Sequence, residues 1–216
     1  MSFSDELRDR TATTWEAATG HRFVDELWAG TVDDAVMGRY LAQDALFLDR
    51  FVALLGGAVA AADRTDARMA IARQLGMVAG EENDYFARAL GRLGIVEPAT
   101  PLPPTQGFLE LMDDARRSGV YGCVLAVLLV AEWLYLDWAA RPEPSPRDWL
   151  HREWIDLHRG SAFAAWVGLL RTETDRVAVA TDDAGRESMA GMFTRAVELE
   201  LAFFDAAYGV DQAAAG

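Results

Sequence analysis

Apolar residues recur at intervals of three and four along nearly the whole chain, whereas stretches that alternate apolar and polar residues between turn signals are scarce. The first spacing places apolar side chains on one face of an α-helix, and the second is typical of strands. The pattern therefore predicts an all-α protein. Composition does not change across the two proline-rich segments, so we expect residues 1–216 to form a single-domain bundle of seven or eight helices.

The same pattern predicts where these helices begin and end. One long helix is expected from Thr31, as its N-cap, to about residue 62, with Asp33 and Asp34 in its first turn. Another is expected to start at Pro146 with Ser145 as its cap. Further helices are expected at about 65–93, 108–118, 120–140, 161–174 and 181–208. The proline-rich stretches 96–107 and 141–146 are expected to be connectors and the tail 210–216 to be disordered.

Three carboxylates interrupt the apolar faces of these helices. Asp44 follows Tyr40 by one turn on the first long helix, Glu132 precedes Tyr135 on the most apolar helix, and Glu200 lies within the last one. A carboxylate on a buried face is costly unless it is paired, hydrogen-bonded or protonated, and burial raises its pKa toward the range useful for acid and base catalysis. Each acid taken alone is more often structural, so the pattern indicates a polar cavity without defining a reaction.

Other chemistries find little support in the sequence. The histidines are His21, His151 and His158, and none belongs to a metal-binding pair. Glu82 is followed three residues later by Tyr85, where a di-iron helix would carry a histidine. There is no nucleophile elbow and no phosphate-binding glycine loop. We therefore expect neither metal nor cofactor.

Charge and cysteine content limit the binding partners and the cellular location that we expect. The net charge is −14, from 34 acidic residues against 20 basic ones that are all arginine, which disfavours nucleic acid and anionic membranes as partners. Cys123 is the only cysteine, and the charged N-terminus does not resemble an export signal, so a cytoplasmic location is expected. Residues 121–140 could span a bilayer, but Glu132 and Asp137 favour a buried helix.

Several segments in order resemble the TenA family. "HRFVDELWAGTVDDAVMGRYLAQDALFL" is similar to the family's opening, most specifically at Gln43 and Asp44. "HREWIDLHRGSAF" resembles its W-I-x-x-Y segment, and "ELELAFFDAAYG" its closing motif. The resemblance extends from about residue 5 to 209. It implies a heme-oxygenase-like bundle without heme, a homo-oligomer, and a role in thiamin metabolism.

The resemblance also implies roles for individual residues. Asp44 matches the aspartate that binds the pyrimidine, and Glu200 matches the catalytic glutamate. The remaining matches are pocket residues: Phe47, Phe108, Tyr135 and Phe203, with His158 in place of a tyrosine.

The family's nucleophilic cysteine is missing, because its motif appears here as "LLVAEWLY" with Ala131 at that position. Glu132 resembles the glutamate of a cysteine-less branch called TenA_E. The sequence therefore predicts a hydrolase of an aminomethylpyrimidine or its N-formyl derivative, in which Asp44 binds the ring, Glu132 holds water and Glu200 relays a proton. Three alternatives remain. They are cleavage of thiamin by a thiaminase II reaction, non-catalytic pyrimidine binding, and a heme-oxygenase-like oxidase related to the quinone-cofactor enzymes.

Overall fold

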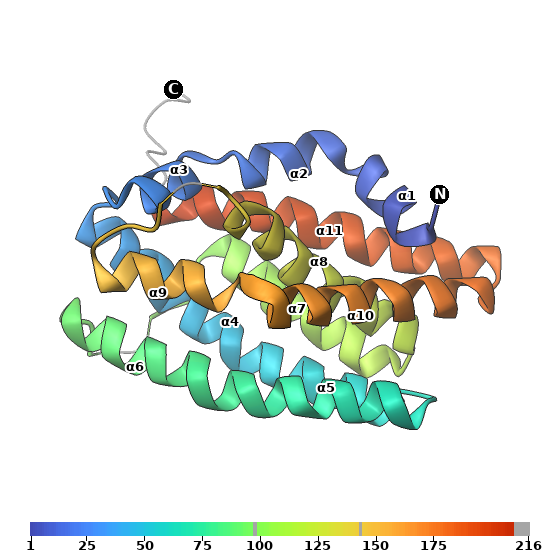
Figure 1. Cartoon of the computed structure of the whole chain (residues 1–216). Coiled ribbons are helices and arrows are strands. Elements are labelled where there is room, and N and C mark those ends of the chain that lie inside the picture. Colours follow the sequence, from blue (N-terminus) through green and yellow to red (C-terminus); the bar gives the residue numbers. More distant parts are fainter. Residues whose placement is uncertain (97–98, 143, 210–216) are drawn as a thin grey trace.

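The computed structural model describes residues 1–96, 99–142 and 144–209, and these residues form helices and loops without strands. The all-α prediction is therefore confirmed, while the tail expected to be disordered lies outside the described residues. The helices, shown in Figure 1, are α1 (Phe3–Arg10), α2 (Ala12–Thr19), α3 (Arg22–Ala29), α4 (Asp34–Ala61), α5 (Thr65–Met77), the π-helical turn η1 (Val78–Glu82), α6 (Asn83–Arg92), α7 (Pro103–Ser118), α8 (Tyr121–Ala139), α9 (Trp149–Leu157), α10 (Gly160–Val179) and α11 (Asp183–Ala207).

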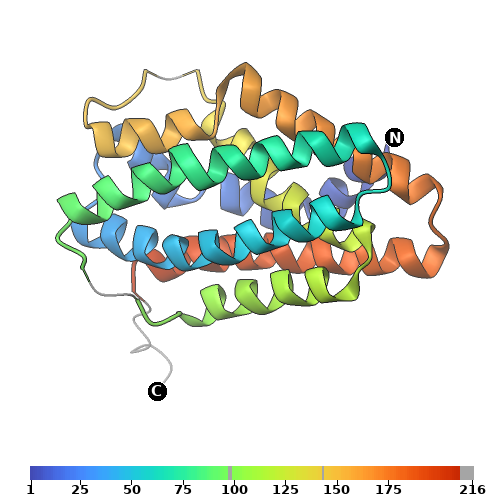
Figure 2. The ribbon, with the colours of Figure 1, turned by 90° about the horizontal axis from the view of Figure 1, so that it is seen from below.

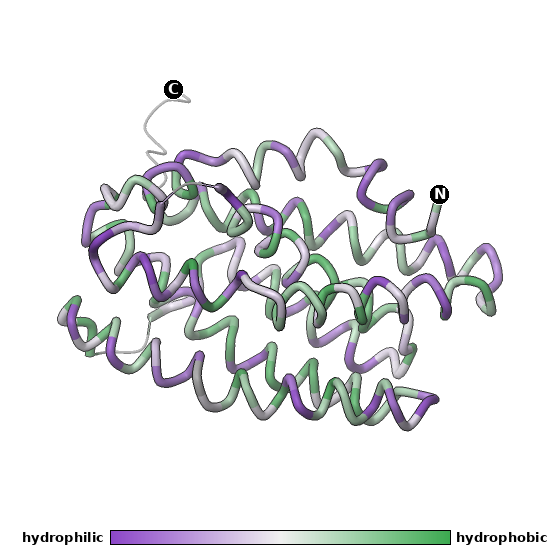
Figure 3. The backbone as a smooth tube through the Cα atoms, viewed as in Figure 1, coloured by the Kyte–Doolittle hydropathy of each residue, from purple (hydrophilic) through white to green (hydrophobic). Residues whose placement is uncertain are grey.

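The apolar helix α8 occupies the centre of the bundle, where it packs against α2, α4, α7, α10 and α11. It has the length and apolarity of a membrane-spanning helix, but 89% of its most apolar stretch is buried inside the protein. The buried apolar side chains form one cluster that includes most of α8. Around it, the outer helices alternate hydrophobic and hydrophilic positions, as Figure 3 shows, so each turns one face inward.

Helices α4 to α11 correspond to the predicted ones if α5 and α6 are counted together, and α1 to α3 are additional short helices at the N-terminus. Seen from below in Figure 2, α5, η1 and α6 follow one another as a nearly continuous rod beside α4. The prediction of one helix over 65–93 missed the π-helical turn in its middle. A π-helical turn inserts one extra residue without ending the helix, so the apolar spacing on either side of it is preserved.

Three predicted helix starts are wrong, those of α4, α9 and α7. Helix α4 is capped by Asp33, whose carboxylate accepts from the amide of Ala35 at 2.8 Å. Thr31 instead completes the end of α3, because Gly30 turns into the left-handed region and the Thr31 amide donates to Glu26.

Helix α9 is likewise capped by Asp148, whose carboxylate accepts from the amide of Leu150 at 3.1 Å. The hydroxyl of Ser145, the predicted cap, instead accepts a hydrogen bond from Arg159. The helix thus begins three residues after Pro146.

The connector between α6 and α7 is shorter than predicted, because α7 begins at Pro103 rather than at Phe108. A proline suits the first turn of a helix, where its missing N–H has no partner to lose. The side chain of Gln43 fastens this connector to α4. Its amide donates to the carbonyl of Thr100 at 3.0 Å, and its carbonyl accepts from the Leu102 amide at 2.8 Å and the Thr105 hydroxyl at 2.7 Å.

Candidate active site

A cavity of about 450 Å³ lies between α4, the α5–α6 rod, α8, α9 and the start of α10. Its wall combines aromatic side chains with several acids. The lining residues are Asp44, Phe47, Leu48, Phe51, Gln74, Met77, Val78, Glu82, Tyr85, Arg88, Ala131, Glu132, Tyr135, Glu153, Trp154, Asp156, Leu157, His158, Arg159, Ala162 and Phe163. Five of the eight predicted site residues are among them.

Asp44 is buried in this wall and forms no ion pair with any of the described residues. Burial raises the pKa of its carboxyl well above the usual value, and the nearby Glu82 raises it further. The hydroxyl of Tyr40, one turn earlier on α4, partly offsets this rise. Asp44 is thus a carboxyl group poised to exchange hydrogen bonds with a ligand.

Glu132 reaches the same cavity from α8. Its side chain belongs to a residue that is only 5% exposed, and its Oε1 has no hydrogen-bond partner among the described residues. Burial raises the pKa of Glu132 to about 8, while the Trp166 indole beside it acts in the opposite direction. Ala131, one residue earlier, presents only a methyl group to the cavity. The inward carboxylate predicted on α8 is therefore present, without a nucleophile beside it.

Glu200 is buried at 2% exposure on α11 but is not part of the cavity wall. Burial and the nearby Asp44 raise the pKa of its carboxyl well above the usual value. Glu200 in turn raises the pKa of both Tyr40 and Tyr135, which places its carboxyl near these two hydroxyls. It therefore lies behind the wall, close to Asp44 and the tyrosines.

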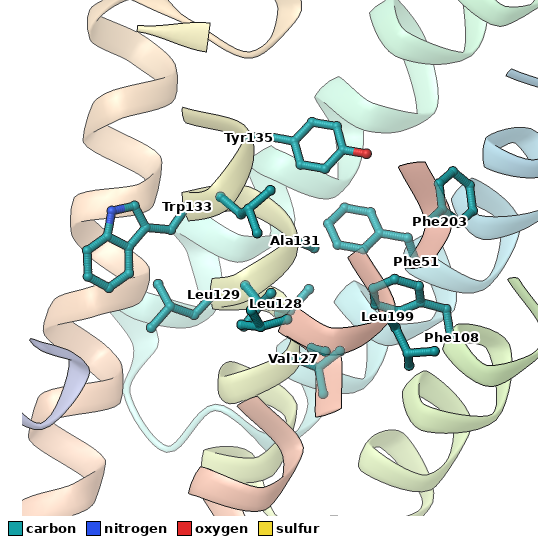
Figure 4. Packing of buried hydrophobic residues seen from close by; sticks show 14 of the residues in the cluster. Phe51, Phe108, Val127, Leu128, Leu129, Ala131, Trp133, Tyr135, Leu199 and Phe203 are labelled. Atoms are coloured by element: carbon teal, nitrogen blue, oxygen red, sulfur yellow. The ribbon is translucent and has the colours of Figure 1, made fainter. Parts of the chain in front are cut away.

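The two tyrosine hydroxyls meet at 2.7 Å between α4 and α8. Tyr40 is fully inside the core, whereas Tyr135 also faces the cavity. Figure 4 shows the Tyr135 ring leaving α8 on the side of Phe203, away from Trp133, which points toward α10. This hydroxyl pair links the cavity to the buried region where Glu200 lies.

Aromatic rings form two layers on this side of α8. Phe47 lines the cavity and meets Phe108 edge-on, with ring centroids 5.2 Å apart. Phe108 and Phe203, whose centroids are 6.4 Å apart, are not part of the lining, and Figure 4 shows both rings on the side of α8 toward which Tyr135 points. The predicted pocket role of Phe47 thus fits the lining, whereas Phe108 and Phe203 support it from behind.

His158 lines the cavity at the end of α9 and is held in one tautomer. Its Nδ1 lies 2.8 Å from the carbonyl oxygen of Trp154, so Nδ1 carries the proton and donates it. Burial lowers the pKa of His158 to about 4, so the ring is neutral at neutral pH and Nε2 is an acceptor. Its ring packs 4.7 Å from that of Tyr135.

Sequence reasoning missed Glu82 as a cavity residue, although the residue was considered for a different chemistry. Glu82 ends the π-helical turn and lies half-buried in the wall, where burial raises its pKa to about 7. The sequence carries no periodic signal for such a turn. Trp154 and Phe163, which complete the aromatic wall, look like ordinary core residues in the pattern.

Comparison with known proteins identifies the family and several relatives of this chain. A sequence model of the TENA/THI-4/PQQC family matches residues 8–210. Two relatives, both named aminopyrimidine aminohydrolase, come from Halalkalibacterium halodurans and Bacillus subtilis and are 23% and 28% identical to this chain. Each match covers 96% of this chain, with 96% of the first relative and 90% of the second.

Solved structures share the fold. A TenA homologue from Pyrococcus furiosus superposes with a TM-score of 0.85 at 19% identity, covering 95% of this chain and all of the other. A protein from a Silicibacter species, described as a TenA family transcription regulator, superposes with a TM-score of 0.85 at 22% identity over 96% of both chains. The heme-oxygenase-like helical bundle expected from the sequence is therefore confirmed.

Proposed function

Since this chain belongs to the TENA/THI-4/PQQC family, with its match over residues 8–210, we propose that it hydrolyses a thiamin-derived aminopyrimidine in thiamin salvage. The substrate would be an aminomethylpyrimidine or its N-formyl derivative. The family membership and the relatives named aminopyrimidine aminohydrolase support this reaction class. The observation that carries the proposal is a cavity wall with two buried carboxyl groups, Asp44 and Glu132, whose described lining holds no cysteine, serine or threonine.

The cavity suits a small flat heterocycle. Pockets for small ligands are mostly apolar, with a few polar groups that set orientation, and their volumes start at about 300 Å³. Here Phe47, Tyr135 and Trp154 supply aromatic faces, and Asp44 supplies a carboxyl that can pair with an amino group on the ring edge. His158 offers a neutral acceptor for a ring substituent.

The chemistry favoured by this wall is direct addition of water. A thiaminase reaction needs a thiolate that adds to the pyrimidine, and the α8 position where the family's motif carries that cysteine is Ala131. Cys123 lies more than two helical turns earlier on α8 and is not part of the lining. Buried carboxyl groups with raised pKa values can transfer protons to and from water instead.

In the proposed reaction on the amine, water adds its oxygen to the exocyclic carbon as the C–N bond breaks, giving a hydroxymethyl product and ammonia. In the N-formyl derivative, water instead adds to the formyl carbon and the amide C–N bond breaks, giving formate and the amine. Glu132 holds this water and, in its ionised form, accepts the proton; its pKa of about 8 makes that carboxylate a strong base whose ionised fraction increases toward pH 8. The amine nitrogen must carry three protons to leave as ammonia, and we assign to Glu200, acting through the Tyr40–Tyr135 hydroxyl pair, the role of supplying or keeping the third one. Asp44 orients the ring throughout.

Turnover assays with the purified protein test this proposal. We expect release of ammonia from 4-amino-5-aminomethyl-2-methylpyrimidine, or of formate from its N-formyl derivative. Glu200→Gln should reduce the rate by about 100-fold or more, the usual contribution of a positioned acid or base. Glu198→Gln, on the exposed face of the same helix, is the matched control and should retain the rate. Cleavage of thiamin alone, or no turnover of either pyrimidine, would contradict the proposal.

A second candidate is a pyrimidine-binding protein without catalysis, favoured by the departures at Ala131 and His158 from the family's pattern. It predicts that calorimetry detects binding of the pyrimidine while no product accumulates over hours. A large rate loss in Glu200→Gln would exclude it.

We further propose that the protein acts in the cytoplasm as a homo-oligomer, and that nucleic acid and membranes are not among its partners. The charge of −14 and the free Cys123 support this setting. Sedimentation velocity measurements should show a species larger than 23.7 kDa, and a mobility-shift assay at low salt should show no DNA complex.

A further inference from the structure

The carboxyl groups around the cavity come from three different segments and influence one another. Asp44 on α4 and Glu132 on α8 each have their ionised form disfavoured by Glu82 of the π-helical turn. All three residues line the same cavity, and this agrees with the mutual effect, because like charges at short range oppose ionisation.

The cations at this cavity are already engaged at its rim. The Arg88 guanidinium contacts the Glu153 carboxylate at 2.6 Å, and Arg159 donates to Asp156 at 2.8 Å. The side chains of Arg88 and Glu153 are 52% and 37% exposed, so they mark where the cavity meets the surface. His158 is neutral, as its hydrogen bond and burial require. Among the described lining residues, neither arginine forms an ion pair with Asp44, Glu82 or Glu132.

One of these acids also has an open acceptor. Glu132 is more than nine-tenths buried and lines the cavity, and its Oε1 forms no hydrogen bond of ordinary geometry with the described residues, although the Trp166 indole beside it favours its ionised form. Buried polar atoms are nearly always satisfied by a hydrogen bond. A group that enters the cavity with both hydrogen-bond donors and a positive charge would satisfy this oxygen and offset the acidic surroundings.

We propose that Glu82 and Glu132 form a cation-binding wall that selects substrates by a protonated amino group, with Glu82 as the specificity-determining residue. This inference rests on the proposed function and names the substrate form: the aminomethyl ammonium rather than the uncharged N-formyl compound. It also explains how the organic product is replaced by a new substrate molecule. Hydrolysis replaces a cationic ammonium with a neutral hydroxyl, so the wall holds the substrate more tightly than the organic product.

The π-helical turn explains how Glu82 comes to lie there. The extra residue of the turn lets α5 and α6 keep their faces toward α4 while the chain bulges at residues 78–82. Val78, at the start of the turn, is buried in the core, and Glu82, at its end, reaches the cavity. Such turns are frequent at functional sites.

The test compares two ligands of nearly the same shape, 4-amino-5-aminomethyl- and 4-amino-5-hydroxymethyl-2-methylpyrimidine. Calorimetric titrations use the Glu200→Gln background, so that the amine is not consumed. We expect the amine to bind at least about tenfold more tightly than the alcohol, and Glu82→Gln to remove most of that difference while leaving the affinity for the alcohol within about twofold. In the otherwise native enzyme, Glu82→Gln should raise KM for the amine more than it lowers kcat.

Glu153→Gln is the matched control, because it removes a carboxylate at the rim whose charge is already engaged by Arg88. It should leave the affinity ratio of the two ligands within about twofold of the parent. Equal binding of amine and alcohol by the parent, or an equal loss of both ligands in Glu82→Gln, overturns the proposal. If the amine is preferred but never converted, the cation-binding wall stands and the proposed hydrolysis fails.

Discussion

At the scale of single residues, Glu132 combines a cost in stability with a proposed role in catalysis. The pKa of its carboxyl is about 8 in the folded protein against an ordinary value of 4.5. Between these values the unfolded chain ionises and loses its proton, while the folded protein keeps it. Stability that is present below about pH 4.5 is therefore lost as the pH rises toward 8.

Glu132→Gln should remove this loss, because the amide does not titrate. We expect the variant to gain about 3 kcal/mol more in unfolding free energy over the parent at pH 8 than at pH 5, as the pKa difference requires. Chemical denaturation at both pH values measures the gain. Glu198→Gln, an exposed carboxylate on α11, should show no such pH dependence. A gain that is the same at both pH values would mean that Glu132 ionises normally in the folded protein.

The position of each acid illustrates what sequence periodicity can predict. Spacing alone indicated that Asp44, Glu132 and Glu200 point inward, and all three are buried. It could not predict that Glu200 lies behind the cavity wall, because that depends on how α11 rotates against α4 and α8. The position of Glu82 in the cavity wall could not be predicted for a different reason. The insertion of one residue shifts the helical phase, and nothing in the composition marks this shift.

At the scale of elements, helix existence was easier to predict than helix ends. The apolar stripes of α4, α8 and α11 are long, so periodicity identifies them without tertiary information. Their ends depend on neighbours. Thr31 and Asp33 are both good N-cap residues, and the structure uses Asp33 because Thr31 already completes α3.

The attachment of the connector to α4 depends on one side chain, Gln43. Gln43→Ala leaves the Leu102 amide and the Thr105 hydroxyl without their acceptor, so we expect a loss of about 2–3 kcal/mol in unfolding free energy. Denaturant titration measures this loss. Gln106→Ala is the control, because that exposed side chain bonds only to Glu110 on its own helix, and its effect should stay within about 0.5 kcal/mol. Equal effects in the two variants would contradict the fastening role of Gln43.

At the scale of the whole molecule, a single buried cluster runs through the helices and has α8 at its centre. The prediction of one domain implies that no group of helices unfolds separately. We therefore expect thermal unfolding to occur in one transition, with midpoints by far-UV and near-UV circular dichroism that agree within about 2 °C. Two separated transitions would show that part of the bundle folds independently.

Gln43 and Asp44 are consecutive on α4, so their side chains leave the helix about 100° apart. One is tied to the outer connector and the other lines the cavity. A rotation of α4 about its axis would move both together, and the three bonds of Gln43 oppose it. The proline-rich connector thus resists rotation of the helix that carries Asp44, the acid proposed to orient the substrate. A change in the length of this connector is therefore expected to move Asp44 without altering any residue of the cavity wall.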